Sequence, residues 1–351
     1  MATTFKNFQP GDITNTRKLF YEAIPITGSI LSGTYLSGTT ETNIKNYSHG
    51  MFQSVYDYPY LSSSANKIFD LSAGFAPTSA LSSSSSIQNS KKINMYNNFA
   101  QNLAGFDTTG SIRLFDQDGD YNAGGTKLNE CFFIPFTRLL SKDEIKKESF
   151  QISVYRSGSN ASMSKLETLS DYGAATNYFV NSPAGEYGLL FSSSAASATG
   201  SNALGIVYYQ AGIVVLTASV FQQTFGMASV TSSWTASVGA ALQSASIQDL
   251  ANGCRHRISA ISFNNCTELN STILTLRASS NEYNYSSNPT ALSGSKIIVK
   301  NNNPLSEPVS FITRGSIYSE NNECLASFSL SEPLKKTPSS GDISIRVRLD
   351  F

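Results

Sequence analysis

Alternation of apolar and polar residues dominates the chain, and most of these segments predict β-strands. The clearest lies near the C-terminus, where Ile343, Ile345, Val347 and Leu349 alternate with polar residues. Period-two alternation is typical of a strand with one buried face. Similar strands are predicted at 273–276, 297–299, 309–312 and 325–330. Short strands separated by Asn, Pro and Gly turns favour a sandwich.

Two longer apolar runs predict buried strands. The stretch 204–221 is rich in β-branched residues but contains polar ones, whereas a transmembrane helix needs about 20 mostly apolar residues. We therefore expect two adjacent strands there, broken at Gln210-Ala211-Gly212. A second run, Cys131–Phe136, predicts one buried strand. No segment is expected to cross a membrane.

Three short helices are expected among the strands. Apolar residues in 93–103 follow helical spacing, with Gly105 as the stop. Ser141-Lys142-Asp143-Glu144 has the form of a capping box, which predicts a helix that begins at Ser141. A third helix is expected over 234–245, closing near Asn252-Gly253.

Together these elements predict a mainly β fold, an antiparallel sandwich-type body with two or three short helices. Residues 1–60 are expected to form an extended N-terminal assembly segment of short strands and glycine turns. Residues 61–255 predict a β-rich body with Ser-rich inserts, of which 62–92 is expected to be flexible or on the surface. Residues 256–351 predict a C-terminal β-sandwich domain.

The charge balance indicates a protein that associates with other proteins. Lys and Arg number 25, Asp and Glu number 25, and the charged fraction of 14% is well below the roughly 25% of ordinary globular proteins. A neutral chain lacks the basic surface for nucleic-acid binding, so no specific nucleic acid is expected. The 11% aromatic content argues against disorder. A neutral surface rich in Ser and Asn has little charge repulsion to oppose association.

Residues suited to catalysis are sparse. The chain has two histidines, His49 and His256, and no nucleophile elbow, phosphate-binding loop or His-Glu-x-x-His motif. A glycosidase stays open as an alternative because its two carboxylates leave no local motif. Cys254, His256 and Cys266 are a local cluster of soft ligands, but a structural zinc site needs four. We expect no enzyme, no catalytic residue, no metal and no cofactor.

The segment Asp116-Gln117-Asp118-Gly119-Asp120 resembles the start of a calcium-binding loop. An EF-hand loop has Gly at its sixth position and Glu at its twelfth, whereas here Gly is fourth and Lys127 is twelfth. The segment is therefore interpreted as a hairpin tip with Asp-Gly turn chemistry. A surface calcium ion on this turn stays open.

Two groups of residues are candidate partner contacts. The first is an aromatic group of Tyr47, Phe52, Tyr56, Tyr58 and Tyr60. Such a stretch anchors a segment in a neighbour's groove, or covers its own core. The second is Arg255-His256-Arg257, the densest basic cluster of the sequence. It fits either docking to an acidic patch of a partner or complementation of a helix dipole.

The C-terminal part carries a resemblance to a known group of proteins. Its most specific segments are Asn284-Tyr285-Ser286-Ser287-Asn288-Pro289 and the terminal Val347-Arg348-Leu349-Asp350-Phe351, and a looser likeness extends to 46–57. These segments resemble virion structural proteins of contractile-tailed phages of marine bacteria, cyanophages above all.

The resemblance implies a virion component and no catalytic residues, and it does not determine the part of the particle. The function we expect is that of a non-enzymatic virion protein of the tail, baseplate or neck. Its partners would be other virion proteins and further copies of itself, in a symmetric ring or in multiple copies. A receptor-binding adhesin or a capsid decoration protein are the alternatives. Met1–Lys6 lacks the basic and apolar pattern of a secretion signal, so assembly in the host cytoplasm and a place in the virion are expected. Strand addition by the N-terminal segment would join adjacent subunits.

Overall fold

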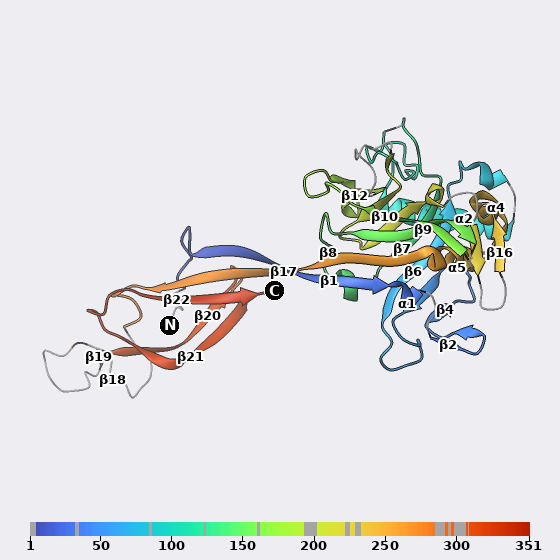
Figure 1. Ribbon diagram of the computed structural model, residues 1–351. Helices are drawn as coiled ribbons and strands as arrows, with labels where there is room; N and C mark the ends of the chain where they lie inside the picture. Colours follow the sequence, from blue (N-terminus) through green and yellow to red (C-terminus); the bar gives the residue numbers. More distant parts are fainter. Residues whose placement is uncertain are drawn as a thin grey trace. The chain divides into compact units, whose positions relative to one another are not determined.

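The computed structural model describes residues 5–31, 35–83, 86–122, 124–159, 162–192, 202–221, 225–228, 233–284, 292–293, 296–297, 307 and 309–351. This part of the chain is mainly β with antiparallel strand pairing and a few helices, which confirms the predicted fold class (Figure 1). The chain divides into a larger unit, residues 19–268, and a smaller unit of residues 1–18 and 269–351. These boundaries differ from the predicted ones, because residues 19–60 belong to the larger unit and not to a separate segment.

The larger unit is built on an antiparallel sheet with the order β17-β9-β10-β12-β13-β14-β7-β6-β5-β4. Along the chain these strands are β4 (Ile44–Asn46), β5 (Gln53–Tyr56), β6 (Lys67–Phe75), β7 (Glu130–Pro135), β9 (Gln151–Ser159), β10 (Ser162–Ser170), β12 (Gly185–Ser192), β13 (Gly205–Tyr208), β14 (Ile213–Thr217) and β17 (Ile258–Ala278). The short strands β8 (Glu144–Ile145) and β11 (Phe179–Ser182) pair with β17 and β12. Two separate pairs are β2 (Leu36–Ser37) with β3 (Thr40–Glu41), and β15 (Phe225–Ala228) with β16 (Ser233–Ala236).

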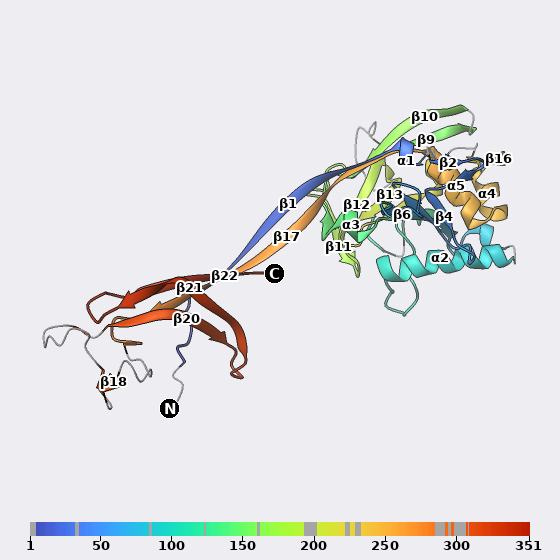
Figure 2. The same ribbon diagram turned by 90° about the horizontal axis from the view of Figure 1, so that it is seen from below.

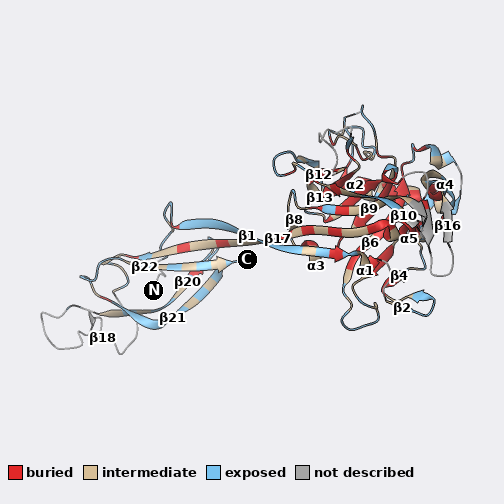
Figure 3. Ribbon diagram, viewed as in Figure 1, coloured by how far each residue is buried: buried red, intermediate tan, exposed pale blue. Residues whose placement is uncertain are grey.

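The central strands of this sheet are covered on both faces. In β7, Phe132 and Ile134 enter one apolar cluster, whereas Cys131 and Phe133 enter the other. This double burial explains why β7 reads as a continuous apolar run. Figure 3 shows the buried residues gathered on β6, β7 and β9 of this unit. Residues of β9, β10 and β17 join the same cluster as Phe132, so the sheet packs against itself as a sandwich-like body.

The predicted hairpin at 204–221 is confirmed. Strands β13 and β14 pair antiparallel, with Tyr208 opposite Ile213 and Val207 opposite Val214. The turn at 209–212 ends with Gly212, which has a φ of 64° and therefore a conformation that suits glycine.

Helices pack on both faces of the sheet. Helix α2 (Ile87–Leu103) supplies Tyr96, Ala100 and Leu103 to one cluster. Helices α4 (Val238–Ser244) and α5 (Ile247–Arg257) contribute to the other, and they lie next to each other in Figures 1 and 2. Helix α1 (Gly28–Leu31) is a single turn, and 3₁₀ turns occupy Ala80–Ser83 and Ala218–Val220. Within the described residues, no helix has the length and apolar character that a membrane span requires.

The Ser-rich stretch 62–92 is not the flexible segment that its composition suggested. It contains β6, a core strand, and the first turn of α2. Ser86 caps α2, because its Oγ accepts a hydrogen bond from the Asn89 backbone N–H at 3.1 Å. The helix therefore begins six residues before the predicted 93–103 and ends at the predicted place.

The predicted helix at the Ser141 capping box is wrong. Helix α3 (Arg138–Ser141) ends where that helix was expected to begin, and Lys142 adopts a positive φ of 54°. The Asp143 N–H then donates to the Cys266 carbonyl at 3.1 Å, and β8 pairs with β17. Pairing with a distant strand replaces the local capping signal.

The third predicted helix is two helices. Ser237 caps α4 and Ser246 caps α5, each through its side-chain oxygen. Trp234, predicted as the first apolar residue of the helix, lies in strand β16. Gly253, expected to close it, lies within α5.

In the smaller unit, the end of β17 pairs with β22 (Ile343–Asp350), and Leu274 faces Val347 in register. The predicted alternation in β22 is confirmed, since its apolar residues are half-buried and its polar ones exposed. A hairpin of β20 (Ser310–Tyr318) and β21 (Cys324–Lys336) completes the unit, with the short pair β18 (Leu292–Ser293) and β19 (Lys296–Ile297).

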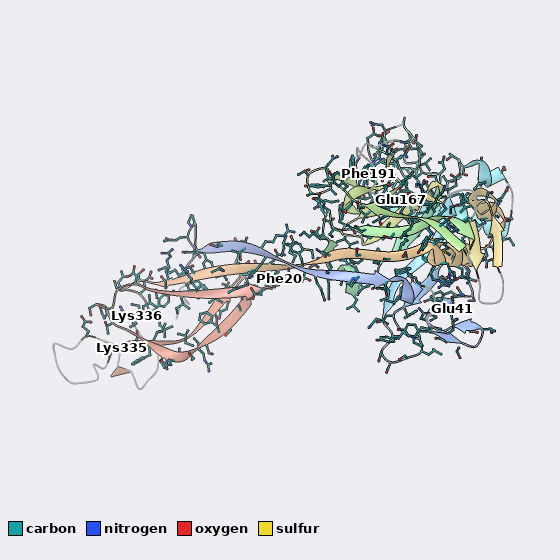
Figure 4. All side chains as sticks on the ribbon, in the orientation of Figure 1. Phe20, Glu41, Glu167, Phe191, Lys335 and Lys336 are labelled. Carbon is teal, nitrogen blue, oxygen red and sulfur yellow. The ribbon has the colours of Figure 1, made fainter. Side chains whose placement is uncertain are left out.

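Few apolar side chains of the smaller unit are fully buried. Among its described residues these are Leu274, Ala278 and Ile317. A buried cation accompanies them, because Lys336 Nζ donates to the Ser280 carbonyl at 2.9 Å and to Asn284 Oδ1 at 3.0 Å. Lys336 is labelled in Figure 4. The small core leaves large apolar side chains of this unit exposed, including Phe311 and Leu325.

Candidate interaction surface

Strand β1 (Ile13–Thr27) is a long strand with almost all of its side chains exposed. In the order of the described strands it lies at one end, where it pairs with β17. Leu19 and Tyr21 lie on one face of the strand because they are two residues apart, and 36% and 50% of their surfaces are exposed. A long edge strand with exposed apolar side chains is a template for pairing with another chain.

At the other end of the order, aromatic residues surround the edge hairpin of β4 and β5. The rings of Tyr47 and Phe52 are 4.8 Å apart between centroids, and those of Tyr56 and Tyr60 are 5.9 Å apart. Lys45 connects the two pairs, since its Nζ lies 4.9 Å from the Tyr47 ring and 5.9 Å from the Tyr60 ring. The structure thus brings these four predicted residues together.

The fifth predicted aromatic residue, Tyr58, is the most exposed of the set. It packs against Tyr35, with ring centroids 5.7 Å apart, and 48% of its surface is exposed. His49 extends the group by stacking on Tyr47 at 5.3 Å. We call Tyr47, His49, Phe52, Tyr56, Tyr58 and Tyr60 the aromatic surface. Apart from the exposed Tyr58 and His49 its members are half-buried, so it is neither core nor a loose loop.

Hydrogen bonds from two helices fix the aromatic surface. Gln248 of α5 donates through Nε2 to the Tyr47 carbonyl at 2.8 Å, and Lys91 of α2 donates to the His49 carbonyl at 2.8 Å. Gln53 of β5 donates to Asn252 Oδ1 of α5 at 2.7 Å. A surface held in this way loses little conformational entropy when it binds.

The predicted docking role of Arg255 and Arg257 is wrong, because both side chains are fully buried within the chain. Arg255 forms an ion pair with Glu41 and donates to the Leu31 carbonyl (Figure 4 labels Glu41). Arg257 donates to the Tyr155 carbonyl at 3.2 Å, and its guanidinium lies 5.1 Å from the Phe225 ring. Both lie in the last turn of α5, which agrees with the alternative that they complement the helix dipole.

His256 is a structural residue next to this ion pair. Burial, with a further contribution from Arg255, lowers the pKa of His256 to about 4. Its Nε2 lies 3.2 Å from Arg255 Nη2 and 3.6 Å from Glu41 Oε1. The ring is therefore neutral near pH 7 and is not a positive contact for a partner.

The sequence suggested a possible metal site at Cys254, His256 and Cys266, and both cysteines of this cluster are buried. Cys254 and Cys266 are buried inside the larger unit and form no disulfide. Burial raises the pKa of Cys254 to about 12, which keeps its thiol protonated. Among the described residues, the three side chains are not a group whose ligand atoms lie close enough together to hold a metal ion.

Asp171 and Lys92 are two buried ionisable groups that could not be predicted from the sequence, because neither belongs to a local motif. Burial raises the pKa of Asp171 to about 6; this carboxylate accepts the Tyr209 hydroxyl at 3.0 Å and two backbone N–H groups. Burial lowers the pKa of Lys92 to about 8. Its Nζ donates to the Leu242 carbonyl at 2.6 Å, near the end of α4. Both groups satisfy buried backbone and so position structure.

The acidic segment Asp116–Asp120 forms a wide loop, not a two-residue turn. The backbones of Asp116 and Lys127 form an isolated antiparallel β-bridge. The Gln117 N–H donates to the Thr126 carbonyl at 3.0 Å. One carboxylate oxygen from each of Asp116, Asp118 and Asp120 lies within 4.8 Å of the other two. Among the residues that the structure describes, these three aspartates are the group that could hold a metal ion.

No protein family model, no curated protein and no solved structure matches this chain.

Proposed function

We propose that this chain is a non-enzymatic structural subunit of a tailed-phage virion, in the tail, baseplate or neck, that acts through permanent protein–protein interfaces. The observation that carries the proposal is the exposed edge strand β1 with its apolar Leu19 and Tyr21. Natural proteins protect such edges with charges, prolines or covering elements. The charges and the proline of β1 (Arg17, Lys18, Glu22 and Pro25) protect this edge only in part. A neighbouring subunit that covers Leu19 and Tyr21 would explain their exposure.

Two further features support permanent association. The smaller unit leaves Phe311 and Leu325 exposed around a small core, and a partner that covers them would remove this apolar surface from water. Because the formal net charge is zero, charge repulsion between copies does little to oppose association. The likeness of the C-terminal segments to phage virion proteins supplies the setting, which is why we propose a virion.

The mechanism we propose is strand addition between subunits. The free edge of β1 would pair with a strand of an adjacent copy of this chain, and backbone hydrogen bonds would supply affinity. Side chains such as Leu19 would supply specificity. Residues 19–60 cannot be removed to test this, because they are built into the larger unit.

The test uses charge on the edge strand. The purified chain is expected to have a mass that is a multiple of 37.8 kDa in light scattering coupled to size exclusion. Because permanent interfaces bury roughly 2,000–5,000 Å², the mass should persist on dilution. The double variant Leu19→Lys/Tyr21→Lys should be monomeric. Leu61→Lys is the matched control, since Leu61 is 86% exposed but lies in a turn.

A monomeric wild-type chain, or a double variant that keeps the oligomeric mass, would contradict the assembly mechanism. The virion assignment is tested separately by mass spectrometry of gradient-purified particles from the source of this sequence. Peptides of the chain should be present in stoichiometric amounts. Their absence from intact particles would refute the virion role.

The aromatic surface favours the adhesin alternative, because exposed aromatic rings are binding platforms with an apolar body and a polar handle. A glycan array with the purified chain decides between the two functions. Saturable binding that is lost in Tyr58→Ala would support the adhesin and count against a purely structural subunit. An array without binding supports the structural role.

A further inference from the structure

We infer that the loop Asp116–Asn122 is a binding site for a divalent cation, with calcium as the ion that fits its ligands best. The site is independent of the proposed function. It rests on the positions of ligand atoms, on the backbone of the loop and on one buried carboxylate oxygen that has no partner.

The carboxylates are spaced for one ion. Two oxygens bound to the same calcium ion at roughly 2.4 Å each are at most about 4.8 Å apart. The three oxygens of Asp116, Asp118 and Asp120 lie within 4.8 Å of one another. Counted from Asp116, these residues occupy positions one, three and five, which supply carboxylate ligands in an EF-hand loop.

The backbone of the loop supports the same assignment. Position seven of an EF-hand loop contributes a backbone carbonyl. Here it is Asn122, whose carbonyl accepts a hydrogen bond from Lys127 Nζ and is therefore not counted among the ligands. Position six is glycine in those loops because the chain turns sharply there. In this chain position six is Tyr121, which adopts a positive φ of 56° and so provides the conformation that glycine would provide.

A buried oxygen independently points to a ligand. The Asp116 side chain is fully buried, and its Oδ1 has no hydrogen-bond partner among the described residues. Burying an unpaired carboxylate oxygen is costly unless a cation or a donor satisfies it. An added Cβ at Gly125 would lie 3.6 Å from this oxygen and 3.4 Å from Asp118 Oδ2, so the two oxygens flank one small space.

Lys127 determines the net charge of the site. Its Nζ lies 2.6 Å from Asp116 Oδ2 and 2.6 Å from the Asn122 carbonyl. It stands at position twelve, where an EF-hand loop has a bidentate Glu. Three carboxylates and one ammonium leave two negative charges, which match a divalent cation. Oδ1 of Asp116 remains available while Lys127 holds Oδ2.

The loop is held in place by the body of the protein. The Tyr187 hydroxyl donates to the Gly119 carbonyl at 2.6 Å, and Asn181 donates to the same carbonyl at 3.1 Å. Tyr121 and Tyr208 are joined through their hydroxyls at 2.8 Å. Gly119 and Tyr121, which flank Asp120 in the loop, are thus attached to an aromatic cluster, which favours a preformed site.

The test titrates the full chain with calcium by calorimetry and with terbium by luminescence, since terbium takes oxygen ligands and tyrosines such as Tyr121 sensitise its emission. Without an acid at position twelve, we expect saturable binding with a dissociation constant of about 10⁻⁴–10⁻³ M. Magnesium should compete weakly, because it demands a stricter octahedral geometry.

Variants assign the binding to this loop. Asp118→Asn and Asp120→Asn should each weaken binding at least about tenfold, which is the effect of losing one charged ligand. Asp107→Asn is the matched control; Asp107 is an exposed carboxylate that holds its own turn through Thr109 and Ser111. Lys127→Glu should tighten binding by about tenfold or more, because it places a carboxylate at position twelve. Circular dichroism spectra establish that each variant is folded.

Two results would overturn the inference. One is the absence of saturable calcium or terbium binding up to about 10 mM, which lies above the weakest calcium modules. The other is unchanged binding in both Asp118→Asn and Asp120→Asn. Either result would mean that Lys127 is the only cation the loop accommodates.

Discussion

The buried ion pair between Glu41 and Arg255 predicts a large loss of stability when Glu41 is neutralised. Arg255 is fully buried, and its Nε has no hydrogen-bond partner among the described residues. The Glu41→Gln variant removes the opposing charge but keeps the size of the side chain. It leaves a buried guanidinium that keeps its hydrogen bond to the Leu31 carbonyl but has lost the charge of Glu41.

The size of the effect follows from this burial. Removing one partner of a buried ion pair costs about 3–5 kcal/mol. The larger unit has about 250 residues, and its unfolding entropy is about 0.5 kcal/mol per kelvin. We therefore expect Glu41→Gln to lower the Tm by about 6–10 °C.

Differential scanning calorimetry measures this change directly. Glu22→Gln is the control, since Glu22 is an exposed carboxylate on β1 and its loss should leave the Tm unchanged. The double variant Glu41→Leu/Arg255→Met should recover most of the loss, because apolar residues of similar size replace a buried pair well. A Tm of Glu41→Gln within about 2 °C of wild type would refute the reasoning.

Three further changes have defined outcomes. The folded pKa of His256, about 4, lies below its ordinary value, so the unfolded state takes up the proton first as the pH falls. The free energy of unfolding should therefore drop by about 2 kcal/mol from pH 7 to pH 5, and His256→Gln should remove this drop. Gly74→Ala should destabilise the protein by about 1–3 kcal/mol, because the added Cβ would lie 2.5 Å from the Lys92 carbonyl oxygen. Gly239→Ala should stabilise it by about 0.5–1 kcal/mol, since this position of α4 has open space around it.

Urea unfolding followed by circular dichroism measures these three changes. The two glycine variants control for each other, because both add one methyl group. Equal effects of Gly74→Ala and Gly239→Ala would contradict the close approach of α2 to β6. A pH dependence of His256→Gln that matches wild type would show that other groups cause the drop.

Strand prediction succeeded where one periodic pattern determines the structure. The alternation in 343–349 and the two runs of 204–221 each follow from local packing, and both were predicted correctly. Prediction failed at Ser141, where a local capping signal competes with pairing to β17. Local signals of about 1 kcal/mol are easily outweighed by tertiary pairing.

The candidate site was predictable only in part. The aromatic residues near Tyr47 are close in sequence, so their gathering on one hairpin could be expected. The burial of Arg255 could not, because its partner Glu41 lies 214 positions away along the chain. In the acidic loop, the spacing of the aspartates can be read from the sequence. The positive φ of Tyr121 cannot, because a tyrosine rarely adopts this backbone conformation.

The division of the chain has a consequence for synthesis. Residues 1–18 belong to the smaller unit, yet their partner residues come late in the chain. For example, the Thr272 hydroxyl, 257 positions after Asn15, donates a hydrogen bond to Asn15 Oδ1. At about 5–20 residues per second, the ribosome needs roughly 10–50 s to make that partner. During this time the larger unit can fold while the start of β1 waits without its native strand. If copies of the chain assemble by the strand addition we propose, a nascent edge strand that waits this long is open to neighbouring chains on the same messenger, and assembly would begin before translation ends.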